Sequence, residues 1–451
     1  MKNLSHHPTE PFPAEEFAFA ARRLARRLAR RLVTLQLSAF FVPAKHGSVT
    51  RNAATWVPMP IIRVEIDALA DVAIDGAAAG QRAWVEVGRR GQIVGIVEGT
   101  TEAGGLSALA LEKLTRSFSS IPVPSRAPIR DDQLPRASVV VPTICQDPAR
   151  LVSTIETVLA LDYPDFDVLV VDNRRNAHGV PMPQFPGGNK VKVLTELRPG
   201  VSAARNCGID YATGDIVAFT DDDVVVDVNW LRELGTRFVI SPEVDGISGL
   251  VLPMELTTRP QLWFEEFFGG FNQSFSTEIM SMELLAPTDR MFPYATGRFG
   301  AGCNMAFRKA VLVKEGGFDV KLGTGSPARG GEDLKIFMKQ VLSGGTVAFE
   351  PRAVVSHQHR ESEKAFLNQV FSYGVGLSAM FTELIIRDPR HLFKLMRRIP
   401  GGYQLLSRPR DERSPSLAPS YPLRTYPYHV LGLLYGPFAY LQSTLRSGPK
   451  G

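Results

Sequence analysis

The chain has 451 residues, of which 44% are hydrophobic and 22% are charged, and its formal net charge is +5. This length is typical of two or three domains, and the composition is that of a globular protein rather than a disordered one. The mild positive charge suits phosphates or acidic lipid headgroups and is too weak to indicate a nucleic-acid partner. Three cysteines without a CxxC spacing argue against a disulfide framework and favour a reducing, cytoplasmic compartment.

The N-terminal segment, residues 1–59, contains one amphipathic pattern. Ala21–Val33 has leucines four residues apart and six arginines between Arg22 and Arg31, which predicts a basic helix. Two interpretations stay open: the helix packs on its own domain, or it lies on a membrane surface. We expect no secretory signal and no transmembrane helix, because no apolar run of about 18 residues occurs.

Residues 60–118 have the pattern of a small accessory α+β domain. Ile61–Ile66 is strand-like, and Gly88–Gly91 separates two further strand patterns, which predicts a hairpin. Ala108–Phe118 predicts a helix. Residues 119–136 contain four prolines, so this segment is predicted to be a linker.

From residue 137 to residue 360, apolar strands alternate with amphipathic helices. The predicted strands are 138–141, 168–171, 191–194 and 216–220, and the predicted helices are 149–161 and 201–211. This alternation predicts a Rossmann-like α/β domain with a mostly parallel sheet and flanking helices. In such a domain the ligand site lies at the carboxyl ends of the strands.

Residues 361–451 are predicted to form a helical extension. A basic stretch from Arg387 to Arg398 precedes a proline-rich segment at 408–422. The apolar stretch Tyr426–Leu441 contains two glycines and two prolines, so we expect it to be interrupted and too short to span a bilayer. It either lies in the membrane interface or packs on the domain.

The clearest chemical signal is the acidic cluster Asp221, Asp222 and Asp223 at the end of an apolar strand. Adjacent carboxylates repel each other, so the cluster is costly unless a cation neutralises it. Carboxylates at a strand end suit Mg²⁺ or Mn²⁺, which bridge to a diphosphate. The alternative is an acidic turn that caps the next helix.

Three weaker signals lie at two strand ends and near the start of a helix. Asp172 ends a strand and suits a ribose hydroxyl or a base N–H, although an aspartate in a turn has the same pattern. Pro142 and Thr143 end the first strand of the domain. Arg205 lies one turn into a helix that follows a turn, which favours phosphate, with a surface arginine as the alternative.

Acidic and imidazole groups also occur near the end of the domain. Glu332 and Asp333 follow two glycines and begin a helix. They are candidates for a general base, or they interact with the helix dipole alone. His357 and His359 end a strand, and either an additional metal ligand or a satisfied surface histidine explains them.

The order of these motifs resembles that of the family 2 glycosyltransferases, inverting enzymes with the GT-A fold. The resemblance runs from about residue 137 to residue 375 and rests on the segments VVVPT, DVLVVDN, GVSAARNCGIDYATGDIVAFTDDD, GAGCNMAFRKAVLVKEGGFD, GGEDLKIF and VSHQHR. It implies transfer of a sugar from a nucleoside-diphosphate sugar, with a divalent cation, Mn²⁺ or Mg²⁺, as the cofactor. The implied acceptor is a glycan, a lipid-linked molecule or a small molecule, and the implied location is cytoplasmic, with the inner face of the cell membrane as an alternative.

The resemblance also implies a role for each motif residue. Asp333 is the implied catalytic base, and the acceptor and sugar side is implied to comprise Gly302, Asn304 and Glu332. The residues implied to bind the nucleotide and donor are Pro142, Thr143, Asp172, Arg205, Asp221 and Asp222. The implied metal ligands are Asp221, Asp223 and His357, with His357 preferred to His359 because it follows the strand directly.

One departure and two alternatives remain. Many family members carry a second acid after the nucleotide-binding aspartate, and this chain has Asn173 there, which changes the contact expected with the base or ribose but keeps Asp172. A nucleotidyltransferase would need a glycine- and lysine-rich loop after the first strand, and Thr143–Asp147 offers neither residue type. A non-catalytic sugar-nucleotide-binding or membrane-surface scaffold protein is the other alternative, and the full set of site residues argues against it.

Overall fold

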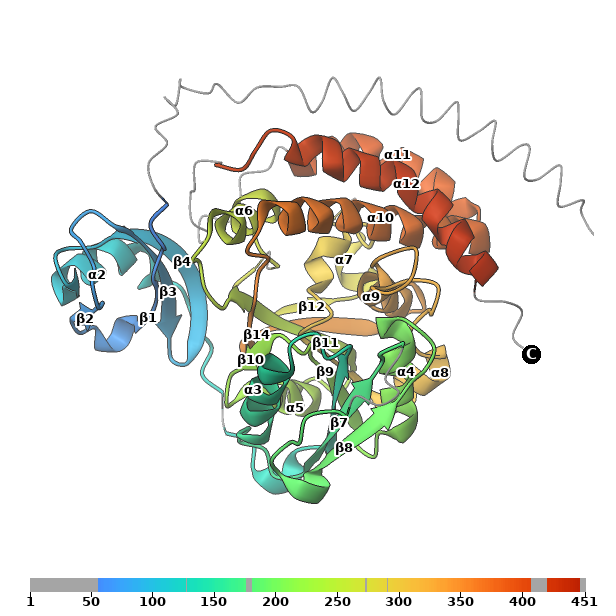
Figure 1. Cartoon of the computed structure of the whole chain (residues 1–451), viewed down its shortest axis with the longest axis horizontal. Coiled ribbons are helices and arrows are strands. Elements are labelled where there is room, and N and C mark those ends of the chain that lie inside the picture. The colour runs from blue at the N-terminus through green and yellow to red at the C-terminus, as the bar shows by residue number, and fades with distance from the viewer. Residues whose placement is uncertain are drawn as a thin grey trace, which may run out of the picture. The chain divides into compact units, whose positions relative to one another are not determined.

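The computed structural model describes residues 56–126, 128–175, 181–271, 274–289, 291–406 and 420–446. The predicted basic helix at 21–33 and most of the proline-rich segment at 408–422 lie outside these residues. Figure 1 traces the described elements from the accessory strands, in blue, to the last helix, in red. The boundaries drawn above between domains remain predictions.

The accessory region contains the expected α+β elements. Its main sheet has the strand order β1-β3-β4, with β1 (Ile61–Glu65), β3 (Arg82–Arg89) and β4 (Gln92–Thr100). Two short strands pair beside it, β2 (Val72–Ala73) and β5 (Gly105–Leu106), and α2 (Ala108–Thr115) follows. The predicted hairpin forms, because Arg90 and Gly91 both have positive φ, 51° and 72°, as a tight two-residue hairpin turn requires.

A nine-stranded sheet forms the centre of the larger region. Its strand order is β10-β14-β11-β13-β9-β6-β7-β8, and β12 pairs with β14. The strands are β6 (Ala137–Thr143), β7 (Phe166–Asp172), β8 (Val191–Thr195), β9 (Ile216–Phe219), β10 (Val224–Val226), β11 (Val244–Pro253), β12 (Glu278–Met280), β13 (Met305–Arg308) and β14 (Thr346–His357).

The predicted α/β architecture is confirmed. Strands β8, β7, β6 and β9 pair in parallel, as do β11 and β14, whereas β13, β10 and β12 add antiparallel pairs. Every residue of β6 and β7 is buried, because both faces of a parallel sheet are covered. Val140 packs in one core cluster and Val139 and Val141 in the other, so the alternation of the strand supplies both cores.

Helices cover the two faces of this sheet (Figure 1). Two of them match the predicted ranges closely, α3 (Pro148–Leu159) and α4 (Val201–Tyr211). The others in this region are α5 (Trp230–Ile240), α6 (Arg259–Phe268), α7 (Met282–Leu285), α8 (Lys309–Glu315) and α9 (Glu332–Leu342). Asp147 caps the start of α3, where its side chain accepts a hydrogen bond from the Arg150 N–H. Helices α4 and α9 begin at the site described below.

The C-terminal extension is helical, as predicted, and consists of α10 (Glu363–Arg387), α11 (Arg390–Leu406) and α12 (Thr425–Arg446). The expected interruption within 426–441 is wrong, because α12 continues through Pro437. Packing explains the difference. A Cβ atom on Gly432 would lie 2.2 Å from the Phe371 carbonyl oxygen, and one on Gly436 would lie 1.9 Å from the Ser378 hydroxyl oxygen. The glycines therefore let α12 pack closely on α10, and this tertiary contact overrides the local helix-breaking tendency.

Among the described helices, α10 is long and apolar enough to cross a membrane by length and composition, although no such helix was expected from the sequence. Within its most apolar 18-residue window, 44% is buried inside the structure. Helix α10 contacts both α12 and α6. Since core helices pass the same test of length and composition, this finding is weak evidence for a membrane span.

Candidate active site

The sequence-predicted residues converge at the carboxyl ends of neighbouring strands. Thr143 ends β6, Asp172 ends β7, the three aspartates follow β9, and His357 ends β14. This convergence follows from the topology, because β7, β6 and β9 run parallel and therefore deliver their ends to one edge of the sheet.

Asp222 connects the acidic cluster to the end of β6. Its carboxylate accepts a hydrogen bond from the Thr143 hydroxyl, and the same hydroxyl oxygen accepts one from the Cys145 N–H at 2.7 Å. Burial raises the pKa of Asp222 to about 6, and the neighbouring charges of Asp223 and Asp221 add to the increase, although the Thr143 hydrogen bond opposes it. The ionised carboxylate of Asp222 is therefore unfavourable in the cation-free protein, mainly because it is buried.

Arg205, on α4, connects the acidic cluster to the start of α9. Its guanidinium donates to Glu332 Oε1 at 2.8 Å, to Asp221 Oδ1 at 3.1 Å and to the Gly302 carbonyl oxygen at 3.1 Å. The residue is only 2% exposed. Because the guanidinium is already surrounded by these partners, Arg205 sets the position of Asp221 and Glu332, and little of it is left to contact a nucleotide directly.

Asp333 lies in the first turn of α9 and is half-buried. Its Oδ2 accepts from the Gly302 N–H at 2.9 Å, and its Oδ1 accepts from the Leu334 N–H at 2.8 Å. A Cβ atom on Gly302 would lie 2.8 Å from an Arg205 guanidinium nitrogen and 3.2 Å from Asp333 Oδ2. Glycine is therefore the residue that lets the backbone approach both side chains. The two backbone donors hold the Asp333 carboxylate in one orientation.

The two histidines at the end of β14 differ in their partners. His357 Nε2 lies 3.4 Å from Asp223 Oδ1, whereas His359 Nε2 lies 2.6 Å from Glu265 Oε1. His359 is also 1% exposed and packs against the ring of Phe264, with the ring centroids 4.5 Å apart. His357 is therefore the histidine beside the acidic cluster, in line with the preference drawn from the sequence.

Asp172 and Asn173 have distinct roles at the end of β7. Asp172 accepts from the Arg174 guanidinium at 2.9 and 2.7 Å. Burial acts to raise the pKa of Asp172, but the Arg174 hydrogen bonds prevail and lower it. The Asn173 amide donates to the carbonyl oxygens of Glu196 and Arg198, both at 2.7 Å, and accepts from the Gly200 N–H at 2.8 Å.

An amide suits position 173 because it donates and accepts at once, which a carboxylate does not do. Asn173 therefore fixes the turn before α4, and with it the helix that carries Arg205. The sequence indicated an altered nucleotide contact at this position. The structure instead gives the side chain a positioning role, a long-range effect that motif spacing does not reveal.

Two residues expected on the acceptor and sugar side are buried. Asn304 has no exposed surface; its amide accepts from Trp230 Nε1 at 2.8 Å and donates to the carbonyl oxygens of Leu250 and Ala353, both at 2.9 Å. Glu332 is 7% exposed and pairs with Arg205. Burial, together with the adjacent Asp333, raises the pKa of Glu332, while Arg205 opposes the increase. Both side chains therefore position the site rather than face a sugar.

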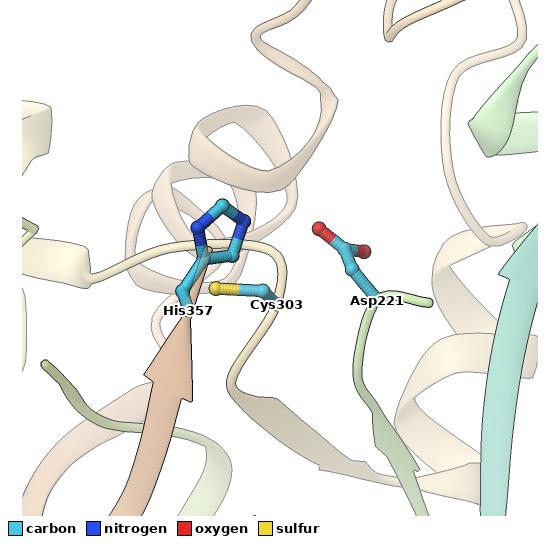
Figure 2. A group of neighbouring side chains, drawn as sticks. All are labelled: Asp221, Cys303 and His357. Atoms are coloured by element: carbon cyan, nitrogen blue, oxygen red, sulfur yellow. The ribbon is translucent and has the colours of Figure 1, made fainter. Parts of the chain in front are cut away.

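A divalent cation has suitable donors at this sheet edge. Asp221, Cys303 and His357 each bring one ligand atom into a group whose members all lie within 4.8 Å of one another. Figure 2 shows the carboxylate of Asp221 facing the ring of His357, with the Cys303 sulfur beneath the ring. Asp223, the other expected ligand, contacts His357. Cys303 was not expected from the sequence; its only signal was its place between Gly302 and Asn304.

The fold is that of an α/β protein, and the side chains described above gather at the carboxyl ends of its parallel strands. The family model described as "Glycosyltransferase like family 2" matches residues 135–372, a little over half of the chain. The chain therefore belongs to this family and is a glycosyltransferase, as the order of its motifs indicated.

The chain is also similar to individual glycosyltransferases and to a solved structure. The chain is 25% identical over 263 residues to the glucosyl-dolichyl phosphate glucuronosyltransferase of Haloferax volcanii, covering 55% of this chain and 78% of that protein. It is 27% identical over 237 residues to the pre-mycofactocin glycosyltransferase of Mycobacterium tuberculosis strain H37Rv, covering 52% of this chain and 45% of that protein. The solved mannosyltransferase PcManGT from Pyrobaculum calidifontis, in complex with GDP-Man and Mn²⁺, aligns with a TM-score of 0.43 and 18% identity, covering 74% of this chain and 93% of that chain.

Proposed function

We propose that this glycosyltransferase moves a sugar from a nucleoside-diphosphate sugar to an acceptor hydroxyl and inverts the anomeric centre. The observation that carries the proposal is the double contact of Gly302, which donates to Asp333 and accepts from Arg205. Through Arg205 this contact connects Asp333, the proposed base, to Asp221. A base and a cluster suited to bind a cation and a diphosphate thus belong to one connected site.

The donor is held at the strand ends in this proposal. Pro142, Thr143 and Asp172 bind the nucleoside, and Asp221, Asp223 and His357 hold a divalent cation. A Mn²⁺ or Mg²⁺ ion bound there supplies Lewis-acid stabilisation of the diphosphate. The Arg205 guanidinium donates a hydrogen bond to Asp221 Oδ1 at 3.1 Å. This contact positions the acidic cluster before the donor binds.

Asp333 is the proposed general base. The acceptor hydroxyl loses its proton to the free lone pairs of this carboxylate as its oxygen forms a bond to the anomeric carbon. At the same time the bond from the anomeric carbon to the diphosphate oxygen breaks, and the electron pair leaves with the diphosphate. One displacement from the opposite face inverts the centre. The two backbone hydrogen bonds at 2.9 and 2.8 Å keep the carboxylate oriented for this transfer.

Calorimetric binding of UDP, GDP, dTDP and CMP, with and without Mn²⁺, tests the donor site. We expect one nucleoside diphosphate to bind the wild-type protein only with Mn²⁺ and to lose at least tenfold in affinity in Asp223→Ala. An exposed aspartate, in Asp132→Ala, is the matched control and keeps the wild-type affinity, since its carboxylate is 67% exposed and pairs with Arg130. Failure of every nucleotide to bind would overturn the donor site.

We further propose that the enzyme works at the inner face of the cell membrane on a lipid-linked acceptor. The outward face of α12 supports this location, because it exposes an apolar stripe at helical spacing: Leu431, Leu434, Phe438, Leu441 and Leu445. Helix α11 adds exposed Phe393 and Met396 beside a basic face that includes Arg390 and Lys394. An apolar stripe beside basic residues suits an anionic bilayer surface.

Sedimentation with vesicles tests this location. We expect the full chain to bind phosphatidylcholine vesicles that contain phosphatidylglycerol, and to bind less at high salt. The double variant Leu434→Glu/Phe438→Glu is expected to lose at least tenfold in vesicle affinity. Val313→Glu is the matched control, because Val313 on α8 is 62% exposed and lies outside the stripe. Equal vesicle binding by the double variant and the wild type would refute the location of the contact on α12.

A further inference from the structure

Cys303 lies in the turn before β13, between two residues that are fixed in place. Gly302 on one side contacts Arg205 and Asp333, and Asn304 on the other side makes hydrogen bonds inside the core. The Cys303 carbonyl oxygen accepts from the Thr220 hydroxyl at 2.9 Å. The backbone of this turn is thus held at both ends, and the position of the thiol follows from it.

The Cys303 sulfur has potential co-ligands. It belongs to the group with Asp221 and His357 whose donor atoms all lie within 4.8 Å of one another. Within the described part of the chain, this is the one such group of three His, Cys, Asp or Glu side chains. Figure 2 shows the sulfur lying beneath the imidazole, with the Asp221 carboxylate on the far side of the group.

His357 supplies the imidazole of this group. Its ring is buried, with 7% of the residue exposed. Its Nδ1 has no hydrogen-bond partner among the described residues. The ring nitrogen that faces the acidic side chains is Nε2, which lies 3.4 Å from Asp223 Oδ1. A cation in this group would therefore bind at Nε2.

We propose that Cys303 Sγ is a protein ligand of the cation site, and that with Asp221 and His357 it makes the site bind Zn²⁺ in preference to Mg²⁺. The inference rests on the cation site of the proposed function. Thiolate and imidazole ligands favour zinc, whereas magnesium favours oxygen ligands. In a tetrahedral zinc site the ligand atoms lie roughly 3.5 Å apart, so any pair of donor atoms near the upper limit of 4.8 Å has to move closer on binding.

Binding changes the protonation of the thiol. The side chain of Cys303 is a thiol, which carries its proton near neutral pH when no cation is bound. When the metal–sulfur bond forms, the S–H bond breaks and the proton passes to solvent, because a coordinating thiol is deprotonated. Zinc binding therefore releases one proton from Cys303, and magnesium held by oxygen and nitrogen alone releases none from it.

Titration of the full-length protein with Co²⁺, a spectroscopic substitute for Zn²⁺, tests the ligand. We expect a sulfur-to-cobalt charge-transfer band in the near ultraviolet for the wild type and for Cys207→Ser. Cys207 is the matched control because it is also buried and free. The band should be absent in Cys303→Ser and Cys303→Ala. Absence of the band in the wild type, or its persistence in either Cys303 variant, would overturn the proposal.

Calorimetry with Zn²⁺ and with Mg²⁺ tests the preference. We expect Cys303→Ser to weaken Zn²⁺ binding at least tenfold and Mg²⁺ binding less than about twofold, since only the soft ligand is lost. Equal Zn²⁺ affinities for Cys303→Ser and the wild type would contradict the proposal. Mn²⁺-dependent nucleotide binding, measured on the same samples, reports separately on the proposed function, so a failure of one inference is distinguishable from a failure of the other.

Discussion

Replacement of Arg205 by methionine is the most informative perturbation of the site's electrostatics. The guanidinium is 2% exposed and pairs with Glu332 at 2.8 Å and Asp221 at 3.1 Å. Removing one partner of a buried ion pair costs about 3–5 kcal/mol, because a buried charge is left uncompensated. We expect Arg205→Met to lower the free energy of unfolding by about this amount near pH 8, measured by urea unfolding of the cation-free protein.

The pH dependence of this loss follows from Glu332. Burial and Asp333 raise the pKa of Glu332, and Arg205 acts against them, so its removal raises that pKa further. A carboxyl whose pKa is raised on folding stabilises the protein at low pH and loses this contribution as the pH rises through its folded-state pKa. The loss in Arg205→Met should therefore be smaller near pH 5 than near pH 8.

Two further variants make the prediction refutable. Arg205→Met/Glu332→Gln, which removes the guanidinium and the more deeply buried of its two carboxylate partners, should recover a large part of the lost stability. Arg116→Met is the control, because Arg116 is 75% exposed in an ion pair with Glu112 and such pairs contribute at most about 1 kcal/mol. A loss below about 1 kcal/mol for Arg205→Met near pH 8, or no recovery in the double variant, would refute the reasoning.

Three other predictions concern groups that the structure constrains. Burial raises the pKa of Asp222 to about 6, so the cation-free protein should lose stability as the pH rises through 6, and Asp222→Asn should flatten the pH profile of the urea midpoint. Gly302→Ala places a Cβ 2.8 Å from the Arg205 guanidinium and should lower the free energy of unfolding by about 1–3 kcal/mol and reduce turnover. Gly436→Ala places a Cβ 2.5 Å from the Val375 carbonyl oxygen of α10 and should destabilise by a similar amount, measured by thermal unfolding.

Each of these predictions has an outcome that contradicts it. An unchanged pH profile in Asp222→Asn would place the strain elsewhere. For Gly302→Ala the matched control is Gly330→Ala, whose Cβ would lie 3.8 Å from its nearest neighbour; equal stabilities of the two variants would contradict the close approach. Wild-type thermal stability in Gly436→Ala would show that α12 does not pack closely on α10.

The sequence predicted the parts of the fold that local periodicity determines. The predicted helix 201–211 coincides with α4, and the predicted strand 168–171 lies within β7. Both follow from short-range patterns, apolar spacing in α4 and an uninterrupted apolar run in β7. The sheet edge that carries Asp221 was predictable because parallel strands present their ends together.

The features that the sequence did not reveal depend on contacts between residues far apart in the chain. The burial of Asn304 depends on Trp230, 74 residues away in the chain, and the continuity of α12 depends on glycines that pack against α10. Cys303 lies close to Asp221 and His357 because β9, β14 and the turn before β13 meet in space. Residue spacing within one segment does not predict contacts between distant segments. The contacts of a side chain are therefore harder to predict from the sequence than its place in a motif.

The central claim, glycosyl transfer with Asp333 as the base, is tested most directly by one kinetic comparison. The nucleotide that binds in calorimetry identifies the donor class, and release of nucleoside diphosphate from the matching sugar donor is then measured for the wild type and Asp333→Asn. We predict that turnover falls by about 10²–10⁴-fold while the donor affinity stays within about threefold. Turnover of Asp333→Asn within tenfold of the wild type would contradict the account.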